Sequence, residues 1–323
     1  MDLQCELCPR QCRIPPGGRG DCRIRVHLDD RLQAVTYGHP CTVHVDPVEK
    51  KPVFHFLPGT PTLSLATVGC NLHCKNCQNW EISQRNPEEV EALELPPERL
   101  VALARQYQCP SISYTYTDPV VYYEYTLDTC TQARAAGLKN ILVTAGYINR
   151  APARELFQVT DAVRIDLKAL SDKFYQDVCG ATLQPVLDTI LLARDMGLEL
   201  ELIHLIIPTL NDRERDLQQL CRWVVEHLGR DVPLHFSRFH PQHLMTHLPP
   251  TPLATLNLAR DLARAAGLSF VYLGNILEPD AATTWCPACR KPLVRRSGFS
   301  LLENRLQHGA CPDCGRKVYG VWN

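Results

Sequence analysis

Short apolar runs alternate with amphipathic stretches along the middle of this chain. Seven runs are rich in β-branched and aromatic residues and have the length of single strands. Between them, apolar residues recur at helical spacing, as at Leu217, Leu220, Cys221 and Val224. Strand–helix units that repeat about every 35 residues predict a parallel sheet with right-handed crossovers. The predicted strands cover residues 62–69, 111–117, 140–145, 162–168, 198–207, 233–238 and 268–274.

The number of these units restricts the fold. Gly137, Gly197 and Gly267 each follow a helical pattern and precede the next strand, as glycine does where helices end. Six or seven units are too few for a closed barrel of eight strands. We therefore expect an α/β fold built on an open, partial (β/α)6 TIM-like barrel, with a doubly wound flat sheet as the alternative.

Cysteine-rich segments flank the alternating region and lack its pattern. We expect three domains: residues 1–58 form an N-terminal four-cysteine metal-binding segment, residues 59–280 form the barrel, and residues 281–323 form a small zinc-ribbon-like module.

Composition excludes several classes of protein. The 323 residues are 45% hydrophobic and 21% charged, with a net charge of −1, so nothing indicates binding to nucleic acid. No apolar run is long enough to span a membrane, and the N-terminus lacks the pattern of a signal peptide. We expect a cytoplasmic protein without a membrane partner.

The sixteen cysteines are the unusual feature of the composition. Four lie near the N-terminus, three follow the first predicted strand, and four lie near the C-terminus. In a long chain without an export signal, clustered cysteines indicate metal binding rather than disulfides.

The central group is Cys70, Cys74 and Cys77, with the spacing C-x3-C-x2-C directly after the first strand. Three thiolates in one loop can bind three irons of a [4Fe–4S] cluster and leave the fourth iron open to a chelating substrate. The alternative is structural zinc, but a fourth ligand at suitable spacing is missing, and His73 would strain a zinc knuckle.

At these cysteines the sequence resembles the radical S-adenosylmethionine (SAM) superfamily, and within it the pyruvate formate-lyase activating enzyme-like proteins. It is most similar to the radical SAM proteins of the AmmeMemoRadiSam type, and the resemblance covers nearly the whole chain. The segments that carry it are CELCPRQC, HVDPVEKKPVFHFLPG, TVGCNLHCKNCQNWEIS, RIDLKALSDKFY, HFSRFHP and the closing GVW.

The resemblance implies an activity and its cofactors. A [4Fe–4S] cluster on Cys70, Cys74 and Cys77 would reduce SAM to methionine and a 5′-deoxyadenosyl radical, which abstracts a hydrogen atom from a substrate. It further implies an electron donor such as flavodoxin or ferredoxin. The substrate would be a glycine of a partner enzyme, as in glycyl-radical activation, or one linked to partners of the Memo and Ammecr type.

Four side chains at strand ends are candidate SAM ligands. Asp118 follows the second strand, where the superfamily has an acidic contact to the SAM amino group, and it also suits a helix N-cap before Pro119. In residues 162–168, apolar and charged residues alternate, which turns Asp166 and Lys168 toward the barrel interior. The resemblance assigns both to the methionyl part of SAM, whereas a structural ion pair is the alternative. Thr144, at the end of the third strand, points inward by the same alternation.

The sequence departs from its relatives at two places near these ligands. The residue before the last cluster cysteine is usually aromatic and is Asn76 here, and the usual Thr-Asn-Gly has Ala145 in its centre. Candidates nearer the substrate lie on the fifth strand and on the end of the sixth, where a barrel binds its substrate, although a histidine on a strand is more often a core residue. These candidates are His204, Ser237, Arg238 and His240.

The two outer cysteine groups predict further metal sites. Cys286, Cys289, Cys311 and Cys314 form two CPxC knuckles, which is the pattern of a zinc ribbon, with a redox cluster as the alternative. Near the N-terminus, zinc is favoured over a second iron–sulfur cluster by a small margin, and Cys41 is a substitute for one ligand. The four cysteines of that group are Cys5, Cys8, Cys12 and Cys22.

The function predicted is therefore reductive cleavage of SAM followed by hydrogen-atom abstraction. The alternatives are radical SAM modification of a peptide, a small molecule or RNA, and a non-catalytic iron–sulfur or zinc scaffold. Near-zero net charge argues against RNA, and the open-iron spacing argues against a scaffold.

Overall fold

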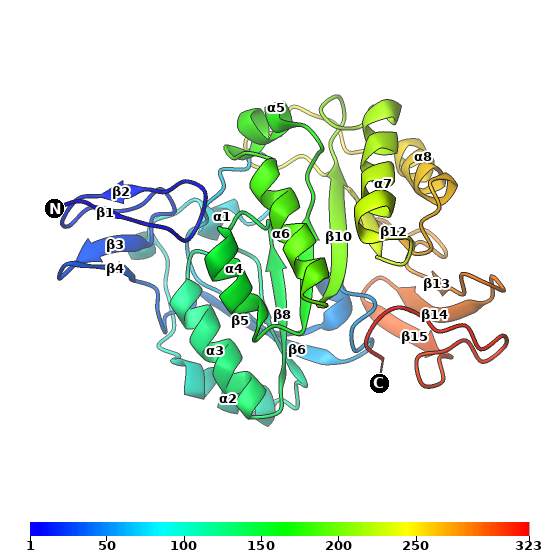
Figure 1. The fold of residues 1–323 in the computed structure, drawn as a ribbon, viewed down its shortest axis with the longest axis horizontal. Coiled ribbons are helices and arrows are strands. Elements are labelled where there is room, and N and C mark those ends of the chain that lie inside the picture. The colour runs from blue at the N-terminus through cyan, green and yellow to red at the C-terminus, as the bar shows by residue number, and fades with distance from the viewer. Residues whose placement is uncertain (323) are drawn as a thin grey trace. The chain divides into compact units, whose positions relative to one another are not determined.

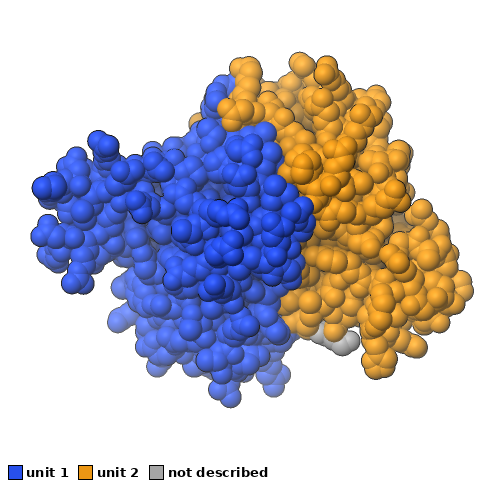
Figure 2. All heavy atoms as spheres, viewed as in Figure 1, with its two compact units in different colours: residues 1–46, 61–163, 176–198 blue, residues 47–60, 164–175, 199–323 orange. Residues whose placement is uncertain are grey.

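The computed structural model describes residues 1–322, which form two compact units coloured separately in Figure 2. The first unit contains residues 1–46, 61–163 and 176–198, and the second contains residues 47–60, 164–175 and those from 199 onward. The predicted domain boundaries after residues 58 and 280 stay predictions, and residue 323 of the predicted C-terminal module lies outside the described residues.

The strands of the first unit follow the order β5-β6-β7-β8-β9 (Figure 1), in which β6, β7 and β8 are parallel and β5 lies at the edge beside β6. In the register of β6 with β7, Leu63 pairs with Ile112, and in that of β7 with β8, Ser113 pairs with Ile141. Helices α2 and α3 pack against each other and against these strands. The elements are β1 (Leu3–Gln4), β2 (Arg13–Ile14), β3 (Arg25–Leu28), β4 (Arg31–Ala34), β5 (Thr42–Pro47), β6 (Pro61–Ala66), α1 (Trp80–Ser83), η2 (Pro87–Glu89), α2 (Pro97–Gln106), β7 (Ser111–Tyr114), α3 (Tyr123–Ala135), β8 (Lys139–Thr144), α4 (Arg150–Phe157), β9 (Ala162–Asp166) and α6 (Gln184–Asp195).

The second unit continues the strand–helix pattern from the end of β9 with the order β9-β10-β11-β12. Strands β10, β11 and β12 are parallel, and α8 packs against β11 and β12. A separate antiparallel sheet has the order β13-β14-β15. Cys286 and Cys289 lie between β13 and β14, and Cys311 and Cys314 follow β15. The elements are η1 (Val48–Lys50), α5 (Asp172–Phe174), β10 (Glu199–Ile206), α7 (Glu214–Leu228), β11 (Leu234–Arg238), α8 (Leu253–Ala265), β12 (Val271–Gly274), β13 (Thr284–Trp285), β14 (Pro292–Ser297) and β15 (Ser300–Asn304). The π-helical turn η3 (Tyr175–Cys179) begins at the last residue of the segment 164–175 and continues in the first unit.

The predicted α/β fold with a parallel sheet is confirmed. Gly137, Gly197 and Gly267 have positive φ angles of 80°, 73° and 103°, which suits the residue after a helix. The last strand begins later than predicted. Leu268 still donates its N–H to the carbonyl of Ala263 at 3.1 Å, which closes α8, so the strand starts at Val271.

A buried polar chain joins the HVDPVEKKPVFHFLPG segment to the C-terminal module within the second unit. The His55 Nδ1–H donates to the carbonyl of Tyr319 at 2.6 Å, so His55 Nε2 accepts from the Tyr272 hydroxyl at 2.6 Å. Tyr272 then accepts from Thr284, which accepts from the Arg296 guanidinium at 3.0 Å. Because each donor has one acceptor, this arrangement requires a neutral His55.

His55 makes the stability of the second unit depend on pH. Burial lowers the pKa of His55 to about 4, so the unfolded chain binds more protons than the folded chain between about pH 4 and 6.5. Stability is therefore lost as the pH falls through this window. We expect wild type to lose about 2 kcal/mol more than His55→Gln between pH 7 and pH 5, measured by urea unfolding. His247→Gln, at an exposed histidine, is the control, and equal losses in all three proteins would contradict the assignment.

Candidate functional site

The cluster loop, residues 69–77, follows strand β6 and is held by backbone hydrogen bonds. Gly69 has a φ of +94°, and a Cβ atom there would lie 2.6 Å from the carbonyl oxygen of Cys22. The N–H groups of His73 and Lys75 donate to the carbonyls of Cys179 and Val178 at 2.8 and 2.9 Å. Only glycine therefore fits at the start of the loop, and the loop is fixed at its centre.

The three thiols of the loop are partly exposed, and those of Cys74 and Cys77 act electrostatically on that of Cys70. Burial raises the pKa of the Cys70 thiol well above its ordinary value, and the Asp118 carboxylate, Cys74 and Cys77 raise it further. The Cys77 Sγ lies 3.2 Å from the hydroxyl of Ser83. Three soft thiolates in one loop are the donor set of an iron–sulfur cluster, and metal coordination would offset the cost of ionising them.

Asp118 is placed between the cluster loop and the end of strand β8. Its carboxylate accepts hydrogen bonds from the Thr144 hydroxyl at 3.0 and 3.1 Å and from the Ala145 N–H at 2.8 Å. It also accepts from the Val120 N–H at 3.1 Å within a turn, but the next helix, α3, begins only at Tyr123 with Tyr122 as its N-cap, so the N-cap interpretation of Asp118 is wrong. The first unit therefore brings Cys70, Asp118 and Thr144 together, and it leaves a buried carboxylate beside a candidate cluster ligand.

Strand β9 and the residues after it carry three charges on one face, as the alternation predicts. Val163, Ile165 and Leu167 are fully buried, whereas Asp166 and Lys168 retain partial exposure. The Lys168 ammonium lies 3.0 Å from Asp166, and the Arg164 guanidinium bonds the other carboxylate oxygen.

These two cations decide the charge of Asp166. Burial alone would raise the pKa of Asp166, but Arg164 and Lys168 lower it to about 2. Asp166 is therefore an anion at neutral pH, and the ion pair offered as the structural interpretation is present. A ligand ammonium or carboxylate at this strand end would meet charges that are already in place.

The substrate candidates of the second unit differ in environment. The His204 Nδ1–H donates to the carbonyl of Leu167 at 2.9 Å, and burial lowers the pKa of His204 to about 4, so this imidazole is neutral. Ser237 is buried at the end of β11, Arg238 donates to the carbonyl of Thr251 at 2.8 Å, and His240 is exposed. His204 and Arg238 thus have structural partners, and all four stay predictions as substrate contacts.

The C-terminal cysteines converge on one point. Their Sγ atoms all lie within 4.8 Å of one another, with Cys286 to Cys314 at 3.5 Å and Cys289 to Cys311 at 3.6 Å. Four thiolates about 2.3 Å from one zinc ion would be separated by about 3.8 Å. Burial opposes ionisation of Cys286, but the N–H groups of Cys289 and Ala288 outweigh it and lower the pKa of that thiol to about 7. The sulfur distances suit a single tetrahedral ion.

The N-terminal cysteines are near neighbours but are less closely gathered. Burial raises the pKa of Cys22, and the thiolates of Cys5 and Cys12 raise it further. Burial also raises the pKa of Cys8 to about 11, and Cys5 and Cys22 contribute to that rise. All four thiols therefore share one electrostatic environment.

Polar contacts between the N-terminal segment and the cluster loop were not predicted from the sequence. Asp21 contacts both the His73 Nε2 at 2.7 Å and the Arg10 guanidinium at 2.8 Å. Arg10 also donates to the carbonyl of Asn71 at 2.6 Å. His73 lies 52 residues from Asp21, so no local pattern in the sequence could have shown this contact.

Comparison with known proteins supports the resemblance to radical SAM proteins that the three loop cysteines indicate. The sequence model of the radical SAM superfamily matches residues 64–221. The uncharacterized protein MJ0808 of Methanocaldococcus jannaschii is 45% identical over 318 residues, which cover 98% of this chain and 95% of that protein. The chain belongs to the radical SAM superfamily, and membership implies a [4Fe–4S] cluster and SAM as its cofactors.

More distant relatives have named functions. The pyruvate formate-lyase-activating enzyme of Clostridium pasteurianum is 24% identical over 158 residues, which cover 47% of this chain and 65% of that enzyme. The crystal structure of Streptococcus suis SuiB bound to S-adenosylmethionine has a TM-score of 0.53 at 14% identity, and it covers 71% of this chain and 53% of SuiB. The likeness to SuiB shows the fold alone. Within residues 1–322, no helix combines the length and the apolar character that crossing a membrane requires.

Proposed function

We propose that the protein cleaves SAM reductively at a [4Fe–4S] cluster on Cys70, Cys74 and Cys77 and abstracts a hydrogen atom from the backbone of a partner protein. The observation that carries the proposal is the position of the Asp118 carboxylate, which raises the pKa of the Cys70 thiol while it accepts hydrogen bonds from Thr144 and Ala145. A carboxylate beside an open iron is suited to accept a hydrogen bond from an amino group that chelates that iron.

Each residue of the proposed site has a separate task. The three cysteines hold the cluster, Asp118 and Thr144 receive the amino group of SAM, and the charges of Asp166 and Lys168 orient its methionyl part. When bound, the reduced cluster supplies the electron that splits the sulfonium of SAM into methionine and a 5′-deoxyadenosyl group, which takes a hydrogen atom from the substrate. The electron comes from a donor of the flavodoxin or ferredoxin type.

The substrate class rests on the activating enzymes among the relatives, whose names specify pyruvate formate-lyase. We infer that the hydrogen comes from the Cα of a glycine in a partner enzyme. A partner of the Memo or Ammecr type is the second candidate, supported by the resemblance of the sequence alone. Zinc in the C-terminal cysteine group, supported by its sulfur distances, has a structural role.

The source of the hydrogen atom distinguishes these candidates. Cells of the source organism are grown with glycine deuterated at Cα, and their extract is separated into proteins and small molecules. Each fraction is incubated with the reconstituted enzyme and SAM. Deuterium in 5′-deoxyadenosine from the protein fraction supports the proposal. Deuterium from the small-molecule fraction alone, or from neither fraction while SAM is cleaved, contradicts the glycine assignment.

Lys168→Ala is expected to raise the SAM concentration needed for half-maximal cleavage by roughly tenfold or more, the loss of one charge-assisted contact. Asp166 keeps Arg164 as a partner in this variant, so the fold and the iron content should not change. Lys139→Ala is the matched control because Lys139 also pairs with an aspartate, Asp161 at 2.8 Å, at the start of a strand. An unchanged SAM requirement in Lys168→Ala would remove this residue from the site.

A further inference from the structure

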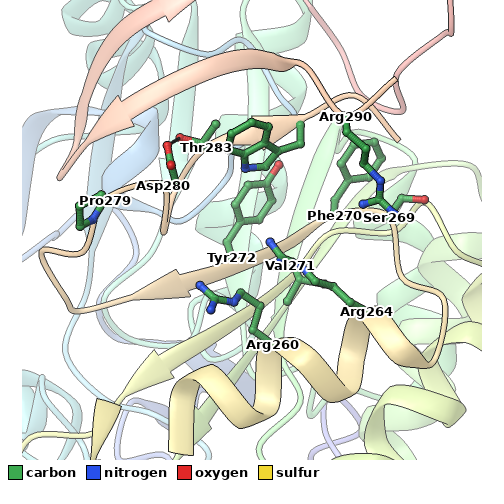
Figure 3. Close-up of a pocket in the computed structure, with 11 residues that line it drawn as sticks. Arg260, Arg264, Ser269, Phe270, Val271, Tyr272, Pro279, Asp280, Thr283 and Arg290 are labelled. Atoms are coloured by element: carbon green, nitrogen blue, oxygen red, sulfur yellow. Dashed lines mark hydrogen bonds between the residues drawn. The ribbon is translucent and has the colours of Figure 1, made fainter. Parts of the chain in front are cut away.

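A cavity of about 460 Å³ lies in the second unit, between helix α8, the start of strand β12 and the first C-terminal knuckle. Figure 3 shows Arg260 and Arg264 rising from one face of the helix toward the strand, and Arg290 beside Phe270 and Ser269. We call this cavity the arginine pocket. Its volume falls in the range of small-molecule sites.

The arginine pocket lies apart from the residues of the proposed reaction. Ser269 and Phe270 come just before β12, at the amino end of the strand, whereas Ser237 pairs with Gly274 at the carboxyl end. The segment after β12 returns along it, with Leu273 donating to the carbonyl of Ala281 at 2.9 Å. This return brings Trp285 and Arg290 back to the start of the strand.

The protein balances the charges of the pocket only in part. Arg260 and Arg264 are one helical turn apart, and like charges at that spacing are mildly destabilising. The nearest carboxylate to the Arg260 Nε is that of Asp261 at 3.7 Å, too far for a hydrogen bond, and this buried Nε has no other partner in residues 1–322. Burial lowers the pKa of Arg264, and Arg260 and Arg290 lower it further. The fold therefore holds three guanidinium groups around a cavity whose lining includes one acid, Asp280.

We propose that the arginine pocket binds a small phosphate monoester that carries a planar organic group, as in a nucleoside monophosphate. The three guanidinium groups outnumber the two carboxylates beside them, Asp261 and Asp280, and a phosphate group offers several oxygens that can accept from more than one guanidinium fork, as a single carboxylate cannot. Val271, Pro279 and Trp285 provide apolar and aromatic lining for the organic part.

The test uses the full-length holoprotein with saturating SAM, so that AMP cannot bind at the SAM site. Calorimetric titration compares AMP, adenosine and inorganic phosphate. We expect AMP to bind, phosphate to compete with it, and adenosine not to bind. Arg264→Gln should weaken AMP binding by at least about tenfold, and Arg264→Lys by less, because lysine keeps the charge without the guanidinium fork. Arg222→Gln, at an exposed arginine of the neighbouring helix α7, should stay within about twofold of wild type.

Two results would overturn the proposal. One is no AMP binding at millimolar concentration in a protein with its metals loaded. The other is AMP binding that is equally strong in wild type and in Arg264→Gln. A circular dichroism spectrum for each variant establishes that a loss of binding is not a loss of folding.

Discussion

Cys74→Ala is expected to abolish assembly of the iron–sulfur cluster. The cluster loop is fixed on both sides of this residue, by His73 and Lys75 on the carbonyls of Cys179 and Val178, so no other cysteine can move into its place. A cluster held by three protein ligands that loses one retains two, and partly ligated iron is readily lost. We expect the visible absorption of the cluster and the bound iron of the loop to fall to background after anaerobic reconstitution.

The matched control is Cys109→Ala. Cys109 is a buried cysteine of the same unit, outside the three cysteine groups, and its Sγ lies 3.8 Å from the carbonyl of Tyr107. Its removal should leave the cluster intact. A Cys74→Ala protein that reconstitutes like Cys109→Ala would show that the loop does not hold the cluster.

Cys311→Ala is expected to release the C-terminal metal and to unfold the sheet β13-β14-β15. Zinc contributes about 10–16 kcal/mol to the folding of zinc-finger peptides, and a module of this size has little core of its own. Cys286 and Cys311 lie inside the apolar cluster that includes Leu293, Val294 and Val318. Loss of the ion would therefore remove the link between the two knuckles that surround this cluster.

The loss is measured by zinc analysis and by limited proteolysis at the turn between β14 and β15, around Gly298. Phe54, Phe270 and Tyr272 belong to the same apolar cluster, so the thermal unfolding temperature of the second unit should fall as well. Cys109→Ala serves again as the control. A Cys311→Ala protein with full zinc and an unchanged cleavage pattern would exclude the four-thiolate site.

The alternation of apolar and charged residues determined much of what the sequence could predict. In β9 it placed Val163, Ile165 and Leu167 in the core and the charged residues on the opposite face, because side chains of a strand alternate strictly. The same regularity placed Thr144 on the face where it meets Asp118. Local patterns of this kind fix which face a residue occupies.

Contacts between distant segments were outside the reach of such patterns. The HVDPVEKKPVFHFLPG and GVW segments were recognised only as shared motifs, and their role appears in three dimensions. A Cβ atom at Gly320 would lie 2.4 Å from the carbonyl of His55, and Val321 donates to that carbonyl at 2.7 Å. The Asp21–His73 contact and the arginine pocket likewise join segments that no periodicity connects.

The measurement that tests the central claim most directly is the formation of 5′-deoxyadenosine. Wild type and a Cys70→Ala/Cys74→Ala/Cys77→Ala triple variant are reconstituted anaerobically, reduced with dithionite and incubated with SAM. We predict 5′-deoxyadenosine from wild type and none above background from the triple variant. Equal product from both proteins, or none from a wild type whose cluster is loaded and reduced, would contradict SAM cleavage at these three cysteines.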